Sequence, residues 1–247
     1  MAAGVPRAGG IGGALSARAS TSPSPGGADV GDRADCDRAA AHLEDAAAPD
    51  VVAWATERFG HELVVTASFQ DCVLVDVAWR VRRDIQVVFL DTQYHFPQTL
   101  AYAERVRRRY DLDLRILRPL ARPDEAWRTD PDACCHARKV EPLRRALAGR
   151  RAWMTGLRRA ESPARAGTPV VAWDAARRLV KVNPLAGWSD DDVQRYVRRR
   201  GLPVHPLRAR GYPSIGCWPC TRSVDQAGDP RAGRWPDRPK TECGLHA

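Results

Sequence analysis

Residues 63–71 read Leu63-Val64-Val65-Thr66-Ala67 and then Ser68-Phe69-Gln70-Asp71, an apolar run that stops abruptly at polar residues. An apolar run of this length is typical of a buried strand. The residues that follow place Val73, Leu74 and Val77 at helical spacing, which predicts a helix directly after the strand. A strand that leads into a helix is the unit from which parallel sheets are built. This stretch therefore predicts an α/β fold.

The same alternation continues along the chain. Pro97 suits the first turn of a second helix, and Ser189 is a good N-cap for another, which Gly201 ends. Alternating strands and helices imply a parallel sheet with right-handed crossovers, and no internal repeat is visible. The expected strands are residues 63–67, 85–90, 112–117, 151–155 and 180–182, and the expected helices include residues 50–59, 97–109, a segment from Cys134 to Leu147, and 190–200.

Composition divides the 247 residues into three parts. Residues 1–45 are rich in Ala, Gly, Ser and Pro, and the first aromatic residue of the chain is Trp54. Such a stretch buries too little apolar surface to offset its conformational entropy, so we expect a disordered low-complexity arm. Residues 46–230 are expected to form one α/β domain that binds a nucleotide and a cluster, followed by a mobile C-terminal segment at 231–247.

Charge and cysteine content limit the class of protein. The net charge of +9 suits an anionic partner, and the absence of a nucleic-acid motif with interleaved aromatic residues favours a small anion over nucleic acid. No apolar run approaches 18 residues, so we expect no membrane span. Seven cysteines, an odd number, without an apolar export signal predict reduced thiols and a cytoplasmic location. A homo-oligomer is possible.

Polar residues follow three of the predicted strands. They are Ser68-Phe69-Gln70, Asp91-Thr92 and Gly156-Leu157-Arg158-Arg159. Ligands of parallel sheets bind beyond the carboxyl ends of the strands, where backbone amides and arginine forks can hold a phosphate or sulfate. Taken singly, the serine could be only a helix cap and the arginine pair only a solvated face. Their shared position at strand ends favours a binding site for an anion.

Four cysteines form two close pairs, Cys134-Cys135 and Cys217-Trp218-Pro219-Cys220. Two sulfurs in a C-x-x-C turn are near enough to share a metal, and adjacent cysteines on the first turn of a helix can lean toward one centre. Four thiolates suit zinc or an iron–sulfur cluster, and spacing alone does not separate these. The alternative is a set of buried thiols or a disulfide.

Cys243 stands near the end of the chain, in Thr241-Glu242-Cys243-Gly244-Leu245-His246. We interpret it as a nucleophile on a mobile segment, against the alternative of an incidental free thiol. Nearby positive charge would lower the pKa of the thiol and attract an anionic substrate, whereas Glu242 would act the other way. The basic residues close to it in sequence are Arg231, Arg234, Lys240 and His246.

From about Val52 to His246 the chain resembles the assimilatory adenylyl-sulfate reductases of bacteria, the cluster-containing branch of the adenylyl-sulfate and phosphoadenylyl-sulfate reductase family. The two most specific motifs are residues 211–217, Gly-Tyr-Pro-Ser-Ile-Gly-Cys, and residues 240–246, Lys-Thr-Glu-Cys-Gly-Leu-His. The others are Cys134-Cys135 with residues 138–142, Thr155-Gly156-Leu157-Arg158-Arg159 and Lys181-Val182-Asn183-Pro184-Leu185.

The resemblance implies a single domain of the adenine-nucleotide hydrolase (PP-loop) type and a [4Fe–4S] cluster on Cys134, Cys135, Cys217 and Cys220. It also implies that Cys243 attacks the sulfur of adenosine 5′-phosphosulfate, displaces AMP and becomes an S-sulfocysteine. Thioredoxin, a separate protein, would then release sulfite. The residues expected to bind substrate are Ser68, Phe69, Gln70, Asp91, Thr92, Lys139, Gly156, Arg158, Arg231, Arg234 and His246, with Lys139 linking the cluster to the sulfate.

Some features depart from the family pattern or favour other activities. Gln93 stands where the family usually has glycine, the stretch between Leu120 and Cys134 is short, and Cys36 and Cys72 match no family role. The phosphoadenylyl-sulfate branch keeps the tail cysteine but generally lacks the two cysteine pairs, which favours adenylyl sulfate as substrate. The remaining alternatives are a phosphoadenylyl-sulfate reductase, an ATP pyrophosphatase and a metal- or cluster-binding sensor.

Overall fold

A six-stranded sheet forms the centre of the computed structural model, in the order β3-β2-β1-β4-β6-β5. All neighbouring strands are parallel except β5 and β6, which are antiparallel. The strands are β1 (Leu63–Thr66), β2 (Val87–Leu90), β3 (Leu114–Leu117), β4 (Ala152–Met154), β5 (Val171–Asp174) and β6 (Leu179–Val182). The predicted α/β fold with a mostly parallel sheet is confirmed, and β5 is a strand that the apolar pattern did not indicate.

The structure describes Met1, residues 25–224 and residues 229–246, with side chains described from Arg33 onward. Its longer helices are α1 (Pro25–Leu43), α2 (Ala48–Phe59), α3 (Val73–Val81), α4 (Pro97–Tyr110), α7 (Glu141–Leu147) and α8 (Asp190–Arg200). Two short helices, α5 (Ala126–Thr129) and α6 (Pro131–Cys135), precede α7. The predicted domain boundary at residue 230 falls beside the undescribed residues 225–228.

Local sequence explains where several helices begin and end. Pro97 occupies the first turn of α4, and Ser189 caps α8 by accepting a hydrogen bond from the backbone N–H of Asp192 at 3.1 Å. Gly201 ends α8 in the left-handed conformation, with φ of 56°. Between α6 and α7, residues His136–Val140 form a wider turn of π type, a distortion common at functional sites, and this turn carries Lys139.

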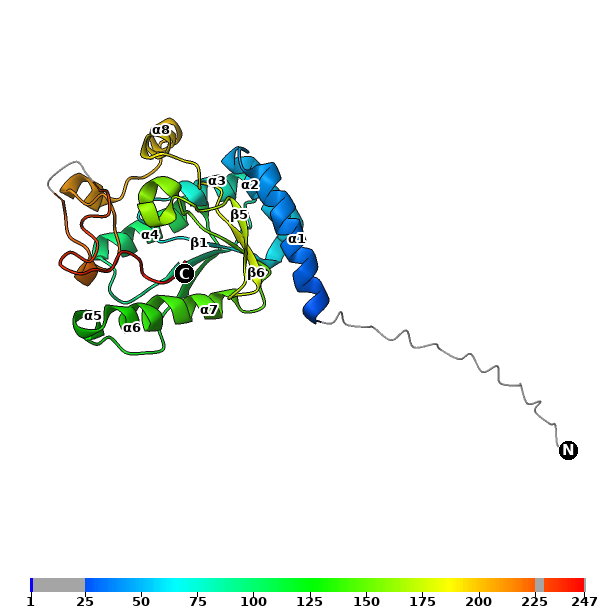
Figure 1. Cartoon of the computed structure of the whole chain (residues 1–247), viewed down its shortest axis with the longest axis horizontal. Helices are drawn as coiled ribbons and strands as arrows, with labels where there is room; N and C mark the ends of the chain where they lie inside the picture. The colour runs from blue at the N-terminus through cyan, green and yellow to red at the C-terminus, as the bar shows by residue number, and fades with distance from the viewer. Residues whose placement is uncertain (2–24, 225–228, 247) are drawn as a thin grey trace.

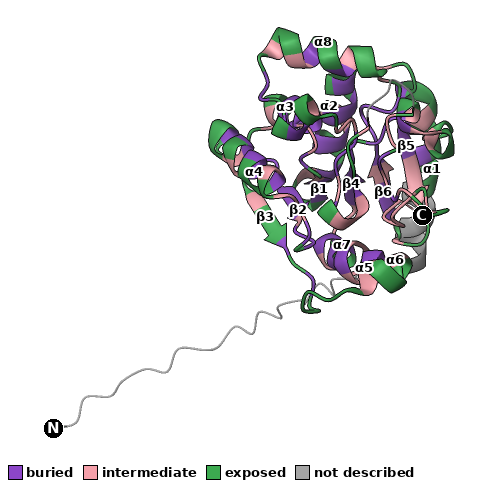
Figure 2. Ribbon diagram, turned by 90° about the vertical axis from the view of Figure 1, so that its left-hand side faces the viewer, coloured by how far each residue is buried: buried purple, intermediate pink, exposed green. Residues whose placement is uncertain are grey.

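Strand alternation builds a core on each face of the sheet. Leu63 and Val65 of β1 point into the larger core, beneath α1, α2, α3, α4 and α8, whereas Val64 points to the opposite face. There it packs with Leu143 and Trp153 under α7. The two views place α7 on one side of the sheet and α2, α3 and α8 on the other (Figures 1 and 2). The ends of the central strands therefore lie between two layers of helices.

The prediction that residues 1–45 form a disordered arm is wrong for its second half. Helix α1 packs beside β5, and its residues Cys36, Ala39 and Leu43 are buried in the larger core. These three side chains fall at i, i+3 and i+7, the spacing of one helical face. The low average hydropathy of the segment concealed this stripe. Residues 2–24 of the predicted arm lie outside the described residues.

Two further sequence interpretations concern buried cysteines and membrane spans. Cys72 is buried at the start of α3, where burial raises the pKa of its thiol to about 12 despite a hydrogen bond with Tyr102. Cys36 and Cys72 therefore have packing roles.

Within the described part of the chain, no helix has the length and apolar character needed to cross a membrane.

We predict that Leu43→Ala destabilises the domain by about 2–4 kcal/mol, because it removes a buried side chain of α1 and leaves a cavity against the sheet. The free energy of unfolding, measured by denaturant titration, checks this. Leu120→Ala is the control, since Leu120 is 79% exposed, and it should change stability by less than about 0.5 kcal/mol. Equal effects of the two substitutions would contradict the packing of α1.

Candidate active site

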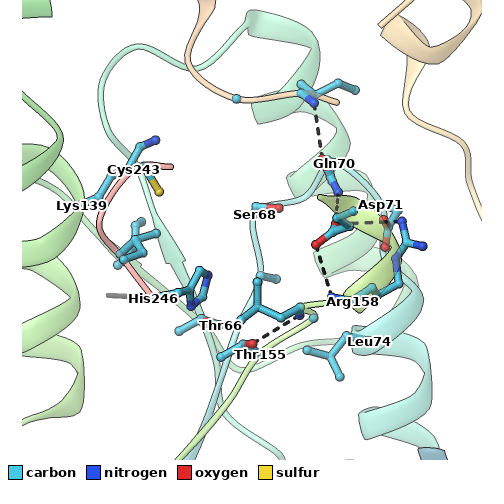
Figure 3. Close-up of a pocket in the computed structure, with 18 of the residues that line it drawn as sticks. Thr66, Ser68, Gln70, Asp71, Leu74, Lys139, Thr155, Arg158, Cys243 and His246 are labelled. Atoms are coloured by element: carbon cyan, nitrogen blue, oxygen red, sulfur yellow. Dashed lines mark hydrogen bonds and ion pairs between the residues drawn. The ribbon is translucent and has the colours of Figure 1, made fainter. Parts of the chain in front are cut away.

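A large cavity opens at the carboxyl ends of β1, β2 and β4, as predicted for a parallel sheet. Figure 3 shows Cys243, Lys139 and His246 on one side of it and Gln70, Asp71 and Arg158 on the other. The predicted site residues that line this cavity are Ser68, Gln70, Thr92, Lys139, Gly156, Arg158, Cys217, Arg231, Arg234, Cys243 and His246. They come from segments spread over most of the folded domain.

Two predicted substrate-binding residues do not line the cavity. Phe69 has a φ of 55°, which turns its ring into the larger core, where it packs edge-on against Phe89 with ring centroids 5.2 Å apart. The carboxylate of Asp91 instead accepts hydrogen bonds from Arg118 at 2.9 Å and from the backbone N–H of Gln93 at 3.0 Å. Both residues support the strand ends rather than the cavity wall.

Gln93 stands where the family usually has glycine, and its backbone conformation is one that glycine adopts easily. Gln93 has a φ of 66°, in the left-handed region that favours glycine. Its side-chain oxygen accepts a hydrogen bond at 2.8 Å from Arg138, a buried guanidinium that also lies 4.5 Å from the centre of the Tyr94 ring. Gln93 is exposed and lies outside the cavity lining. The substitution therefore leaves the cavity open.

One side of the cavity is organised by Glu161, a buried carboxylate. It accepts hydrogen bonds from the side chain of Gln70 at 3.5 Å and from the backbone N–H of Arg158 at 3.3 Å. The guanidinium of Arg158 reaches past it and donates to Asp190 at 2.7 Å, the first residue of α8. Arg158 therefore lines the cavity while its charge is already paired with a surface carboxylate.

Positive charge gathers around the C-terminal segment. Lys139, Arg165, Arg231 and Arg234 all line the cavity. Arg234 donates to the Ser214 hydroxyl at 3.2 Å, and its Nε is buried without a hydrogen-bond partner. A Cβ on Gly216 would lie 2.3 Å from Arg234 Nη2, so a side chain at this position would require the guanidinium to move. Such a group of cations suits an anionic ligand with more than one charged centre.

The thiol of Cys243 lies within this positive field. Partial burial raises the pKa of the thiol, but the Lys139 ammonium, a hydrogen bond from the Leu245 backbone and the Arg234 guanidinium outweigh it. The pKa of Cys243 is therefore below its ordinary value, although Glu242 acts in the opposite direction. A thiol with a depressed pKa beside a cavity has the character of a nucleophile.

Lys139 lies among three thiols. Burial would lower the pKa of its ammonium group, but Cys217, Cys243 and Cys135 together raise that pKa above its ordinary value. These thiols therefore favour the charged form of Lys139. It lines both the large cavity and a smaller neighbouring one.

The four paired cysteines line the smaller cavity together, beside Tyr94, Trp127 and Arg138. All four are free thiols, and the Cys217 sulfur lies 3.2 Å from the hydroxyl oxygen of Thr92. Burial raises the pKa of Cys135 to about 11 and also raises the pKa values of Cys134 and Cys220. Among the described residues, no three His, Cys, Asp or Glu side chains are grouped tightly enough for a single metal ion.

The C-terminal segment is packed along the cavity rather than extended into solvent. Its last described residue, His246, stacks on Trp153 with ring centroids 5.3 Å apart, and the carbonyl of Leu245 accepts a hydrogen bond from Arg177 at 3.1 Å. Lys240 forms an ion pair with Asp132 of α6. Burial and the neighbouring cations Lys181, Arg165, Arg177 and Arg231 lower the pKa of His246 well below its ordinary value, which keeps the imidazole neutral.

Sequence reasoning missed several residues of the site. Arg165, Glu161 and Trp153 all line the cavity. Trp153 lies inside an apolar strand and was indistinguishable from core. Arg165 and Glu161 follow the Arg158-Arg159 pair in a loop with no regular period, where the only signal was the number of charged residues near a strand end.

The comparisons with known proteins agree with this geometry. A family model described as the phosphoadenosine phosphosulfate reductase domain matches residues 62–223. The chain belongs to this family. The adenosine 5′-phosphosulfate reductase of Mycobacteroides abscessus is 47% identical over 223 residues, which cover 87% of this chain and 94% of the relative. That of Streptomyces coelicolor is 49% identical over 218 residues, which cover 85% and 92%. The predicted family is confirmed.

Solved structures show the same architecture. The phosphoadenylyl-sulfate reductase of Candida auris in a phosphate complex has a TM-score of 0.68 and 28% identity, and the match covers 76% of this chain and 96% of that one. The FMN adenylyltransferase of Candida glabrata, with FAD and inorganic pyrophosphate, has a TM-score of 0.55 and 15% identity, and the match covers 80% and 78%. The second match shows the fold alone. The predicted PP-loop type of domain is confirmed.

We predict that Lys139→Met raises the pKa of Cys243, because the largest source of positive potential at the thiol is removed. A lowered pKa means that the thiolate is present above that pKa and lost as the pH falls through it, so the midpoint should move to higher pH in the variant. The pH dependence of Cys243 alkylation measures the midpoint. Arg115→Met, on the exposed edge of β3, is the control, and an unmoved midpoint in Lys139→Met would argue against the assigned interaction.

Proposed function

We propose that this chain reduces adenosine 5′-phosphosulfate to sulfite and AMP, with Cys243 as the nucleophile and thioredoxin as the reductant. The observation that carries the proposal is the place of Cys243, whose thiol lines the large cavity beside Lys139 and Arg234 with a lowered pKa. The names of the curated relatives support the choice of substrate. The carboxyl ends of the strands supply the position expected for a nucleotide.

In the first stage the Cys243 thiolate attacks the sulfur of the phosphosulfate. An S–S bond forms while the S–O bond to phosphate breaks, and AMP leaves with the electron pair of that bond. Because AMP is a good leaving group, the step requires no strong general acid. The repulsion between the thiolate and the anionic substrate is the main obstacle, and Lys139, Arg231 and Arg234 can offset it electrostatically. The enzyme is left as an S-sulfocysteine.

In the second stage a thiolate of thioredoxin attacks the Cys243 sulfur. The S–S bond to the sulfonate breaks, and sulfite leaves with its electron pair. The second thiol of thioredoxin then resolves the mixed disulfide, which regenerates the Cys243 thiol and leaves oxidised thioredoxin. The two electrons that reduce the sulfate group therefore come from one dithiol. This chemistry requires reduced thiols, which suits the cytoplasm.

The donor set of the smaller cavity suits a [4Fe–4S] cluster, which cysteine thiolates hold. Four free thiols line that cavity. Cys134, Cys135, Cys217 and Cys220 would hold the cluster. When bound, it would cross-link the two cysteine pairs and supply an anionic centre beside Lys139.

We predict that Cys243→Ser binds adenosine 5′-phosphosulfate but releases no sulfite, because a hydroxyl is not ionised near neutral pH and cannot take part in disulfide exchange. Binding is measured by calorimetry and sulfite release with reduced thioredoxin present. Cys36→Ala, a buried cysteine of α1 distant in sequence from every site residue, is the control and should remain active. Sulfite release by the serine variant at the wild-type rate would refute the assigned nucleophile.

The same assay separates the two sulfonucleotide substrates. We expect a higher kcat/KM with adenosine 5′-phosphosulfate than with its 3′-phosphorylated form. A preference for the phosphorylated substrate would instead assign the chain to the phosphoadenylyl-sulfate branch, whose architecture it shares.

We predict that protein purified without oxygen contains about four irons and four acid-labile sulfides per chain. Cys220→Ala should lose most of both, because one corner of the cluster is then unligated, whereas Cys36→Ala should retain them. Elemental and sulfide analysis gives both quantities. Stoichiometric zinc without sulfide would overturn the cluster assignment.

A further inference from the structure

Glu242, the residue immediately before Cys243, is held by two arginines. Its two carboxylate oxygens accept hydrogen bonds from Nε and Nη2 of Arg165, each at 2.7 Å. Arg231 Nη2 lies 3.3 Å from the same carboxylate. A forked pair of this kind fixes orientation as well as distance. The peptide unit next to the nucleophile is therefore tied to the wall of the cavity.

One partner of Glu242, Arg165, is anchored in the domain, because it is also paired with Glu161, the buried carboxylate that accepts hydrogen bonds from Gln70 and Arg158. The other, Arg231, belongs to the C-terminal segment itself and donates to the backbone carbonyl of Thr241 at 2.8 Å. Burial raises the pKa of Glu242, but Arg165 and Arg231 outweigh this and hold it below its ordinary value, so the carboxylate is ionised. We call the contacts of Glu242 with Arg165 and Arg231 the Glu242 clamp. Through Arg165, this clamp joins the end of the chain to the loop after β4.

An acidic residue at this position works against the nucleophile. The charge of Glu242 raises the pKa of the Cys243 thiol and opposes the effect of Lys139 and Arg234. It also partly neutralises two of the arginines that line the cavity and would otherwise attract an anion. The presence of an acidic residue before Cys243 is therefore not explained by activation of the thiol. It is explained by a role in placing the thiol.

We propose that Glu242 is a positioning residue, a latch that holds the Cys243 segment on the cavity through Arg165, with Arg231 as a second partner inside the same segment. This inference rests on the proposed function. While the latch is closed, the thiol faces the large cavity and the first stage of the reaction is favoured. For the thiol to meet a second protein the segment must move outward, and the Glu242 clamp is the contact nearest the thiol that must break.

The test uses Glu242→Gln in the full-length protein with its cysteine sites loaded. The neutral amide keeps the size of the side chain but loses the charged fork. We expect single-turnover formation of the S-sulfocysteine, followed by mass spectrometry, to slow by about 10-fold to 100-fold, the usual effect of a misplaced reacting group. The midpoint of the pH profile should not rise, because the removed charge was unfavourable to the thiolate. A slower transfer without a raised midpoint separates positioning from activation.

A second measurement needs no substrate. The alkylation rate of Cys243 at its alkaline plateau reports access to the fully ionised thiol, and we expect Glu242→Gln and Arg165→Gln each to raise it severalfold. Both substitutions break the same Glu242–Arg165 contact, so their effects should not add. The alkylation rate of the double variant should therefore be no higher than that of either single variant. Glu44→Gln is the matched control, since Glu44 pairs with Arg159 of the same loop without touching the C-terminal segment, and its rate should match the wild type.

The outcomes distinguish the latch from the reaction itself. Wild-type transfer and alkylation rates in Glu242→Gln would overturn the latch and leave the proposed function intact. A wild-type protein that forms no S-sulfocysteine would overturn the proposed function, while the alkylation rates would still decide whether Glu242 holds the segment closed. Glu242→Asp, which keeps the charge on a shorter side chain, should fall between the wild type and Glu242→Gln in both measurements.

Discussion

The electrostatic interaction between the Lys139 ammonium group and the surrounding thiols is the one on which the charge balance of both cavities depends. The ammonium group lies among the thiols of Cys135, Cys217 and Cys243, which together raise its pKa above the ordinary value despite burial. A buried cation is tolerated only where negative charge surrounds it, and each ionised thiol in turn requires a cation. Lys139 therefore links the cysteine-lined cavity to Cys243 electrostatically. Its position follows from the π-type turn between α6 and α7, which places Lys139 one turn beyond the adjacent cysteine pair.

The parallel sheet supplies the geometry around this interaction. Because β1, β2 and β4 all end at the same edge, the polar residues that follow them meet at one cavity although they are far apart in sequence. Helices on both faces pack hydrophobic cores against the sheet. The C-terminal segment contributes Arg231, Arg234 and Cys243 to the wall of the cavity.

The C-terminal segment docks on the domain through contacts of different strength. The Trp153–His246 stack, the Lys240–Asp132 pair and the clamp on Glu242 all hold it in place. The Lys240–Asp132 pair has an exposed carboxylate and contributes modestly. The fork between Arg165 and Glu242 is more buried and doubly hydrogen-bonded. Under the proposed function the segment faces a small anion in one stage and a protein in the next, so its contacts with the domain must be breakable. The unfavourable effect of Glu242 on the thiol is consistent with a trade of reactivity for placement.

The sequence alone determined the alternation of strands and helices, the cysteine pairs and the cysteine in the tail, because local period, spacing and terminal motifs are properties of neighbouring residues. It also directed attention to the strand ends, and most of the residues predicted there line the cavity. Only the tertiary structure decided the rest. Phe69 turns into the core through a positive φ, Asp91 is engaged by Arg118, and α1 packs on β5 with a stripe too sparse to register in average hydropathy. Arg165 reaches Glu242 across 77 residues of chain, and no local pattern encodes a contact of that separation.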